Sequence, residues 1–121
     1  MQIQTIEINN QKIAEVISDE IIICNVQDGL DLLGNLYYQG FEKVIIYQRN
    51  IIADFFDLKT GIAGEILQKF TNYRMPLIII GEFENIQSKS LNDFIFESNK
   101  GKQVNFLKSK EEAVKKLINQ H

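Results

Sequence analysis

The sequence has little of the residues on which many catalytic and metal sites depend. It has one cysteine, Cys24, and one histidine, His121, at the last position, where we expect a frayed terminus. A single cysteine cannot close an internal disulfide bond. Metal sites made of histidine and cysteine are excluded by count, and no Ser-His or Cys-His catalytic arrangement is evident. We therefore expect no catalytic residues, no metal and no cofactor.

Three further absences narrow the classes of partner. The net charge is −3 and the lysines are scattered, so no broad basic field attracts nucleic acid. The glycine-rich motifs that cradle phosphates are missing. The longest apolar runs, Leu77–Ile80 and Ile21–Cys24, are too short to cross a bilayer, and no apolar segment follows Met1. We expect a cytoplasmic protein that binds neither nucleic acid nor membranes.

The composition is that of an ordinary folded domain. Hydrophobic residues make up 45% of the 121 residues, which is enough to fill one core. Internal repeats, low-complexity stretches and flexible linkers are absent. Residues 1–121 are therefore expected to form a single domain.

Strand and helix patterns alternate along most of the chain. Residues 2–8 and 12–17 are predicted to form an antiparallel hairpin that turns at Asn9-Asn10. Further strands are predicted at 44–47, 77–80 and 104–107, with a short extended piece at 21–24, and helices at 25–40, 58–73, 90–98 and 109–118. This order predicts an α/β fold, with a mixed, mostly parallel sheet, an N-terminal antiparallel hairpin and about four helices.

The apolar spacing also predicts which helix faces are buried. The first helix is expected to bury Val26, Leu30, Leu33 and Tyr37, and the second Leu58, Ile62, Ile66, Phe70 and Tyr73. Ala63 and Gly64 are small enough to bring the second helix close to the sheet. Ser90, with Asp93 three residues later, is expected to cap the third helix.

The loop before the second helix holds the main candidate site, formed by Asp54, Asp57, Lys59, Thr60 and Gly61. In the first turn of a helix, free backbone N–H groups and the Thr60 hydroxyl would receive an anion, with Lys59 adding positive charge. A Thr-Gly pair in a helix turn is also common without any ligand. Asp57, just before the helix, is equally explained as an N-cap.

Asp54 and Asp57 have a second interpretation. Together with Glu82, which follows the next strand, they would supply carboxylates for a divalent cation or for acid–base catalysis. The sequence outlines no substrate pocket around them, so this hypothesis ranks last.

Two other features each have two interpretations. Cys24 precedes a helix start, where the helix dipole would lower its pKa, but we favour a buried small hydrophobe at a strand end. Phe55-Phe56 would form an exposed aromatic platform, but we favour a split pair, with one ring in the core and the other covering it.

Several stretches of the chain have a familiar layout: Val44–Tyr47, then Phe56–Ala63, then Leu77–Gly81 and Glu111–Ala113. From about Lys12 to Ile118 this layout resembles a STAS domain, the fold of bacterial anti-sigma factor antagonists and of sulfate-transporter tails. Phe55–Leu67 is also similar to the Phe-Phe-Asp-Leu-x-Thr-Gly-x-Ala-Gly-Glu-Ile-Leu motif of an uncharacterised bacterial family of short single-domain proteins. That family has no known activity.

The resemblance implies that Asp57–Gly61 faces a partner. In the antagonists a phosphorylatable serine in this loop switches binding to an anti-sigma factor. Here the two serine positions hold Lys59 and Thr60, and Asp57 lies one residue further away, so the switch is not carried over.

These observations give a leading hypothesis and alternatives. The leading hypothesis is a non-enzymatic regulatory protein–protein interaction module, which binds its partner through the Asp54–Gly61 loop and the following helix. The main alternative is a binder of a small anionic ligand or nucleotide at the helix N-terminus Lys59–Gly61. The exposed edge of the N-terminal hairpin also leaves open a homodimer.

Overall fold

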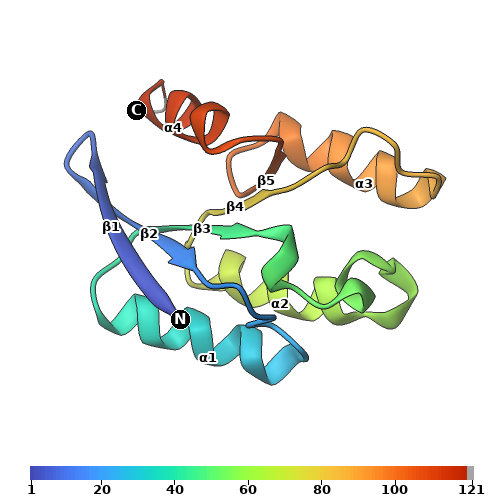
Figure 1. Ribbon diagram of the computed structural model, residues 1–121, viewed down its shortest axis with the longest axis horizontal. Coiled ribbons are helices and arrows are strands. Elements are labelled where there is room, and N and C mark those ends of the chain that lie inside the picture. Colours follow the sequence, from blue (N-terminus) through green and yellow to red (C-terminus); the bar gives the residue numbers. More distant parts are fainter. Residues whose placement is uncertain (120–121) are drawn as a thin grey trace.

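One mixed sheet of five strands organises the molecule (Figure 1), and the computed structural model describes residues 1–119. The strands lie in the order β1-β2-β3-β4-β5, with β1 antiparallel to β2 and every later pair parallel. Their bounds are Gln2–Ile8, Gln11–Ile17, Lys43–Tyr47, Leu77–Ile80 and Val104–Leu107. The helices are α1 Val26–Tyr38, α2 Ile62–Asn72, α3 Lys89–Lys100 and α4 Lys110–Ile118. The predicted α/β fold class is confirmed.

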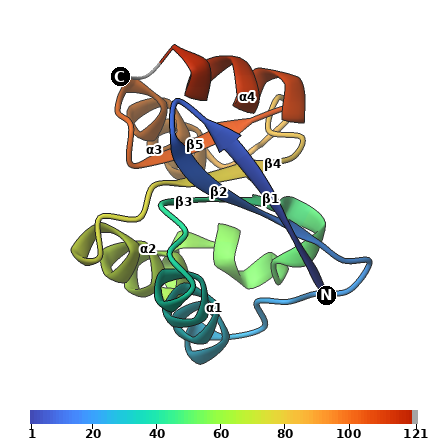
Figure 2. The ribbon, with the colours of Figure 1, turned by 90° about the vertical axis from the view of Figure 1, so that its left-hand side faces the viewer.

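The sheet separates two apolar layers. Alternate residues of a strand point to opposite faces, so Ile46 of β3 joins the larger core with α1, α2 and α3, while Ile45 joins a smaller one under α4. Figure 2 shows α1 and α2 on one side of the sheet and α4 on the other. None of the helices within residues 1–119 is long and apolar enough to cross a membrane.

The hairpin turn follows the prediction. Asn9 and Asn10 have φ values of 54° and 64°, the left-handed pair that a two-residue turn of type I′ requires. The Asn9 side-chain amide also donates to the carbonyl of Ile118, 3.0 Å away, and so ties the turn to the end of α4.

The β5 edge of the sheet is covered by α3. The Asn99 side chain accepts a hydrogen bond from the backbone N–H of Phe106 at 2.7 Å and donates to the carbonyl of the same residue at 3.1 Å. One amide side chain thus replaces a neighbouring strand at this residue. Such cover keeps an edge strand from pairing with another chain.

The buried face of α1 follows the prediction in part. Leu33 is buried as predicted, and Val26 and Leu30 are half-buried, but Tyr37 is 55% exposed, and the other buried side chains are Leu32 and Leu36. The reason is the close approach of α1 to α2 at Gly29, where an added Cβ atom would lie 2.8 Å from Cδ1 of Ile66. This contact turns the helix so that the side of Gly29, rather than that of Tyr37, faces the core.

The face of α2 is predicted in part. Ile66 and Phe70 are buried, but Tyr73, expected in the core, is 47% exposed and stacks edge-on against the Tyr37 ring at 5.1 Å. Gly64 points away from the sheet, with nothing within 4 Å of an added Cβ atom, so it does not serve the close approach that was expected of it.

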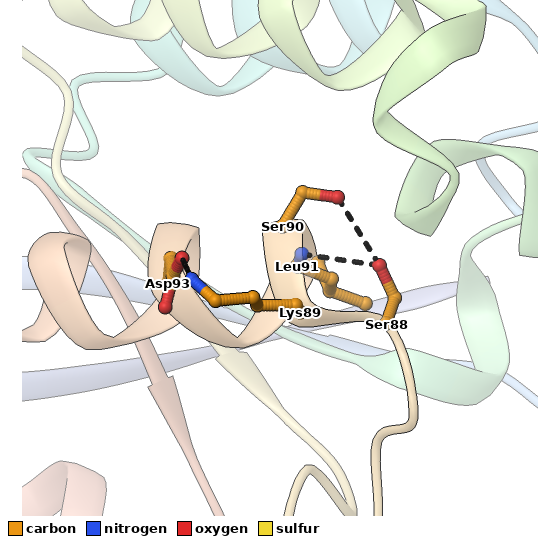
Figure 3. A network of polar contacts seen from close by, with 5 residues as sticks. All are labelled: Ser88, Lys89, Ser90, Leu91 and Asp93. Carbon is orange, nitrogen blue, oxygen red and sulfur yellow. Dashed lines mark hydrogen bonds and ion pairs between the residues drawn. The ribbon is translucent and has the colours of Figure 1, made fainter.

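The start of α3 lies before the predicted residue. Ser88, not Ser90, is the N-cap, and its hydroxyl accepts a hydrogen bond from the Leu91 N–H at 3.3 Å (Figure 3). The Ser90 hydroxyl lies 3.3 Å from that of Ser88, and Lys89 pairs with Asp93 at 2.9 Å. Two serines at helix-start spacing made the choice between them ambiguous in the sequence.

The piece expected at 21–24 is barely a strand. Only Ile23 forms a bridge, to Ile51. Cys24 is exposed, so the expectation of a buried small hydrophobe is wrong. Its backbone N–H donates to the Asp28 carboxylate at 3.0 Å, because Cys24 lies just outside the α1 cap rather than at the end of a buried strand.

Candidate functional site

The segment that carries the predicted site leaves β3 at the carboxyl end of the parallel strands. It folds into three short 3₁₀ turns, Gln48–Asn50, Ala53–Phe56 and Leu58–Thr60, before α2 begins. The five predicted site residues are all exposed: Asp54, Asp57, Lys59, Thr60 and Gly61. The structure therefore brings them together on one surface segment, outside the core.

Thr60 holds the segment in shape. Its hydroxyl lies 2.8 Å from the carbonyl oxygen of Asp54 and 2.9 Å from that of Asp57, and it donates to this pair of acceptors. The same hydroxyl accepts a hydrogen bond from the N–H of Ile62 at 3.3 Å. One side chain thus joins two successive turns to the start of α2.

Asp57 and Gly61 mark the two ends of the last turn. The Asp57 carboxylate accepts from the Lys59 N–H at 3.3 Å and so caps a 3₁₀ turn, not a long helix. Gly61 has a φ of +79°, a left-handed conformation that ends the turn. The predicted helix at 58–73 is corrected to Ile62–Asn72, because Gly61 interrupts the helical backbone.

The backbone donors of this segment already have acceptors. The Lys59 N–H donates to the Asp57 carboxylate, and the Thr60 N–H donates to the Asp57 carbonyl. The Gly61 N–H donates to the Leu58 carbonyl, and the Ile62 N–H donates to the Thr60 hydroxyl. An anion at Lys59–Gly61 would have to break some of these bonds. The free donors on which that alternative depends are absent from these four positions.

A row of aromatic rings lies beneath the segment. Ring centroids are 5.0 Å apart for Phe55 and Phe56, 6.0 Å for Phe56 and Phe83, 5.4 Å for Phe83 and Phe106, and 5.9 Å for Phe106 and Phe94. Phe55 is buried and Phe56 half-buried, which confirms the expected split of the pair. The row connects the segment through the core to α3.

A groove of about 440 Å³ runs between α2 and α3. Its apolar lining includes Leu67 of α2, Phe94 of α3 and Val104 of β5. Gly64 also lines it and lies about one helical turn beyond Gly61, so the groove begins close to the end of the Asp54–Gly61 segment. The absence of a side chain at Gly64 leaves this end of the groove open.

A polar cluster that the sequence did not predict lies on the opposite face of the sheet. Glu15 of β2 is 3% exposed, and its Oε2 accepts a hydrogen bond from the Tyr47 hydroxyl at 2.6 Å. Lys110 Nζ, at the start of α4, lies 2.8 Å from Glu15 Oε1 and forms an ion pair with it. The angles of this contact are not those of a hydrogen bond. A lone glutamate in the apolar strand Gln11–Ile17 was the signal for this cluster.

This cluster changes the acidity of Tyr47. Burial, followed by the hydrogen bond to Glu15 and the negative charge of that residue, raises the pKa of the phenol to about 12. The guanidinium of Arg49 lies 4.5 Å from the ring centre of Tyr47 and opposes the shift. The cluster joins α4 to the sheet through three side chains, a structural role that accounts for its burial.

The divalent-cation hypothesis finds no support in the geometry. Within residues 1–119, no three side chains of His, Cys, Asp and Glu are placed to hold a metal ion, so Asp54, Asp57 and Glu82 do not form such a site. Glu82 instead lines a hollow of about 530 Å³ with Lys108 and Ser109, between the loops that follow β4 and β5. His121 lies outside the described residues.

The fold and this surface define a small α/β protein with a partly parallel sheet and an exposed loop at its carboxyl edge. The family model described as "Domain of unknown function (DUF4180)" matches residues 8–117, which is most of the chain. The chain therefore belongs to this family. No curated protein and no solved structure matches it.

Proposed function

We propose that this chain is a non-enzymatic regulatory module that binds a protein partner through the Asp54–Gly61 segment and the exposed face of α2. The observation that carries the proposal is a pre-shaped, exposed loop. The side chains of Thr60 and Asp57 form hydrogen bonds to backbone groups of the same loop and hold it in one conformation. The loop therefore loses little conformational entropy when it binds a partner.

The neighbouring surface supports a macromolecular partner rather than a small ligand. Close to the end of the loop begins the groove between α2 and α3, where Leu67, Phe94 and Val104 offer apolar contact. Interfaces combine such apolar contact with a polar rim, which Asp54, Asp57 and Lys59 would supply here. The resemblance to STAS domains points the same way, since it implies a partner-facing loop at Asp57–Gly61.

Charge reversal of Lys59 tests the proposal. The side chain is exposed and, within residues 1–119, makes no hydrogen bond or ion pair, so Lys59→Glu should leave the fold unchanged. The matched control is Lys115→Glu, an exposed lysine of α4 on the other side of the sheet. Both variants and the native chain are used as bait in lysate of the native cells, and the captured proteins are identified by mass spectrometry.

We expect at least one partner to be captured by the native chain and by Lys115→Glu but not by Lys59→Glu. Identical partner lists for the three baits would overturn the proposed surface. The alternative, a small anion or nucleotide at Lys59–Gly61, predicts instead that phosphate or nucleotides raise the melting temperature of the native chain and not that of Lys59→Glu.

A further inference from the structure

The two edges of the sheet differ in whether the outer backbone groups of the edge strand are occupied. At the β5 edge, Asn99 of α3 occupies the backbone N–H and carbonyl of Phe106. At the other edge, β1 pairs with β2 on one side and, within residues 1–119, with no strand on its other side. Strand β1 is seven residues long and contains neither lysine nor proline, the residues that commonly block an edge strand.

The hairpin register fixes which backbone groups point outward from β1. Ile8 and Gln11 flank the two-residue turn and form its hydrogen-bonded closing pair. Hydrogen-bonded and non-hydrogen-bonded pairs alternate along an antiparallel ladder. The N–H and carbonyl groups of Ile3, Thr5 and Glu7 therefore point away from β2, toward an empty strand position.

A groove lies directly beside this open edge. It has a volume of about 280 Å³ and separates β1 from α1. Its lining includes Met1, Ile3 of β1, and Asp28, Asp31, Leu32 and Leu36 of α1. The volume is below the range of about 300–1,000 Å³ that small-molecule sites occupy, so it suits a side chain of a peptide better than a whole ligand.

The charged side chains that line the groove are of one sign, whereas the N-terminal amine of Met1, another lining residue, is positive. Asp28 and Asp31 of α1 line it, and no lysine or arginine does. Ile3, Leu32 and Leu36 supply its apolar part. Open backbone groups beside an apolar groove are the two elements of peptide binding by strand addition, in which the ladder supplies affinity and the groove supplies specificity.

We infer that β1 and the groove beside it bind an extended segment of a partner protein as a sixth strand. The segment pairs with the outward N–H and carbonyl groups of Ile3, Thr5 and Glu7. On the side of α1 it places an apolar side chain in the groove and a basic side chain against Asp28 and Asp31. This surface differs from the Asp54–Gly61 surface of the proposed function and does not depend on it.

A second copy of β1 is a poorer occupant than a basic segment. Antiparallel pairing with full overlap centres on Thr5 and sets Glu7 of one copy opposite Ile3 of the other. Ile3 shares its groove with Asp28 and Asp31, so each glutamate would meet two carboxylates. Like charges placed together in this way oppose association.

Two blocked heptapeptides test the inference by NMR titration of the whole chain. In both peptides threonine alternates with a residue that faces the groove. The three groove-facing residues are valine, arginine and valine in the first peptide, and valine, glutamate and valine in the second. Asp31→Lys cancels the net side-chain charge of the groove, because Asp28 remains. Asp93→Lys is the matched control, because Asp93 is likewise an exposed helical aspartate bonded to the residue four positions earlier.

We expect the arginine peptide to bind at least about fivefold more tightly than the glutamate peptide. Asp31→Lys should abolish this preference and Asp93→Lys should keep it. Bound peptide should slow the hydrogen exchange of the Ile3, Thr5 and Glu7 amides. Equal or absent binding of the two peptides would overturn the inference. So would protection of these three amides that rises with chain concentration without peptide, since a second copy would then fill the edge.

Discussion

Among single residues, Asn50 connects two loops at the carboxyl end of the strands. It is fully buried, and its side-chain amide donates to the carbonyls of Ser18 and Glu20, each at 2.8 Å. The backbone carbonyl of Asn50 accepts hydrogen bonds from the N–H groups of Ile22 and Ile23 at 2.7 and 3.0 Å. The segment before α1 is thereby fixed to the segment that leads into the proposed binding loop.

Asn50→Ala should be destabilising. It removes the hydrogen bonds to the carbonyls of the half-buried Ser18 and the exposed Glu20, and a bond of this kind contributes about 0.5–1.5 kcal/mol. We expect the free energy of unfolding, measured by urea denaturation, to fall by about 1–3 kcal/mol. Asn85→Ala, an exposed asparagine, is the control and should change it by less than about 0.5 kcal/mol. Equal effects of the two variants would contradict the role of Asn50.

Tyr47 gives the chain a pH dependence at high pH. Its pKa is raised to about 12 in the folded chain, against 10.0 ordinarily, so the unfolded state loses this proton first. Its stabilising contribution is therefore complete below pH 10 and is lost as the pH rises toward about 12.

Tyr47→Phe should remove this part of the alkaline decline in the free energy of unfolding. It should also lower stability at neutral pH by about 1–2 kcal/mol, because Glu15 Oε2 loses its donor. Urea denaturation at several pH values from about 7 to 12 measures both effects, because the range runs from neutral pH through the ordinary pKa of 10.0 up to the shifted value of about 12. Tyr38→Phe, at a tyrosine that is 92% exposed, should keep the native pH profile. A native profile in Tyr47→Phe would refute the assignment.

At the scale of elements, the two glycines at the start of α2, Gly61 at its N-cap and Gly64 in its first turn, should respond oppositely to alanine. An added Cβ meets nothing within 4 Å at either Gly61 or Gly64, so packing does not differ. Gly61 has a φ of +79°, which alanine adopts only with strain, whereas Gly64 lies inside a helix.

We expect Gly61→Ala to lower the free energy of unfolding by about 1 kcal/mol and Gly64→Ala to raise it by about 0.5–1 kcal/mol. The pair is measured by urea denaturation under one set of conditions. A loss of stability in both variants, or in neither, would show that Gly61 does not set the junction.

The elements themselves were largely predictable from the sequence, because strong local patterns agree with the fold. The Asn9-Asn10 turn, the apolar run Leu77–Ile80 and the strand-helix alternation each have one plain interpretation. The helix faces were less predictable. A close contact such as that of Gly29 with Ile66 joins residues far apart in sequence, and it displaced Tyr37 from the core.

The candidate site was predictable in position but not in detail. Asp54, Asp57, Lys59, Thr60 and Gly61 do share one exposed segment. Their hydrogen bonds could not be foreseen, since Thr60 reaches back six residues to the carbonyl of Asp54. The contacts of Glu15 with Tyr47 and Lys110 were missed because they join three separate elements.

In the whole molecule, the proposed binding surfaces lie where the fold is least covered. α3 blocks the β5 edge and α4 covers the second face of the sheet, whereas the β1 edge and the α2–α3 groove stay open. The loop Asp54–Gly61 lies at the carboxyl end of the parallel strands, where α/β proteins commonly place their binding sites.

Photocrosslinking in the native cells tests the proposed binding surface most directly. Benzoylphenylalanine is placed at Gln68, an exposed α2 residue that lines the groove, or at Glu111, an exposed residue of α4. Light should yield a discrete protein adduct from position 68 that position 111 does not give, and Lys59→Glu should abolish it. The same adduct from both positions, or an adduct at 68 that survives Lys59→Glu, would contradict the account.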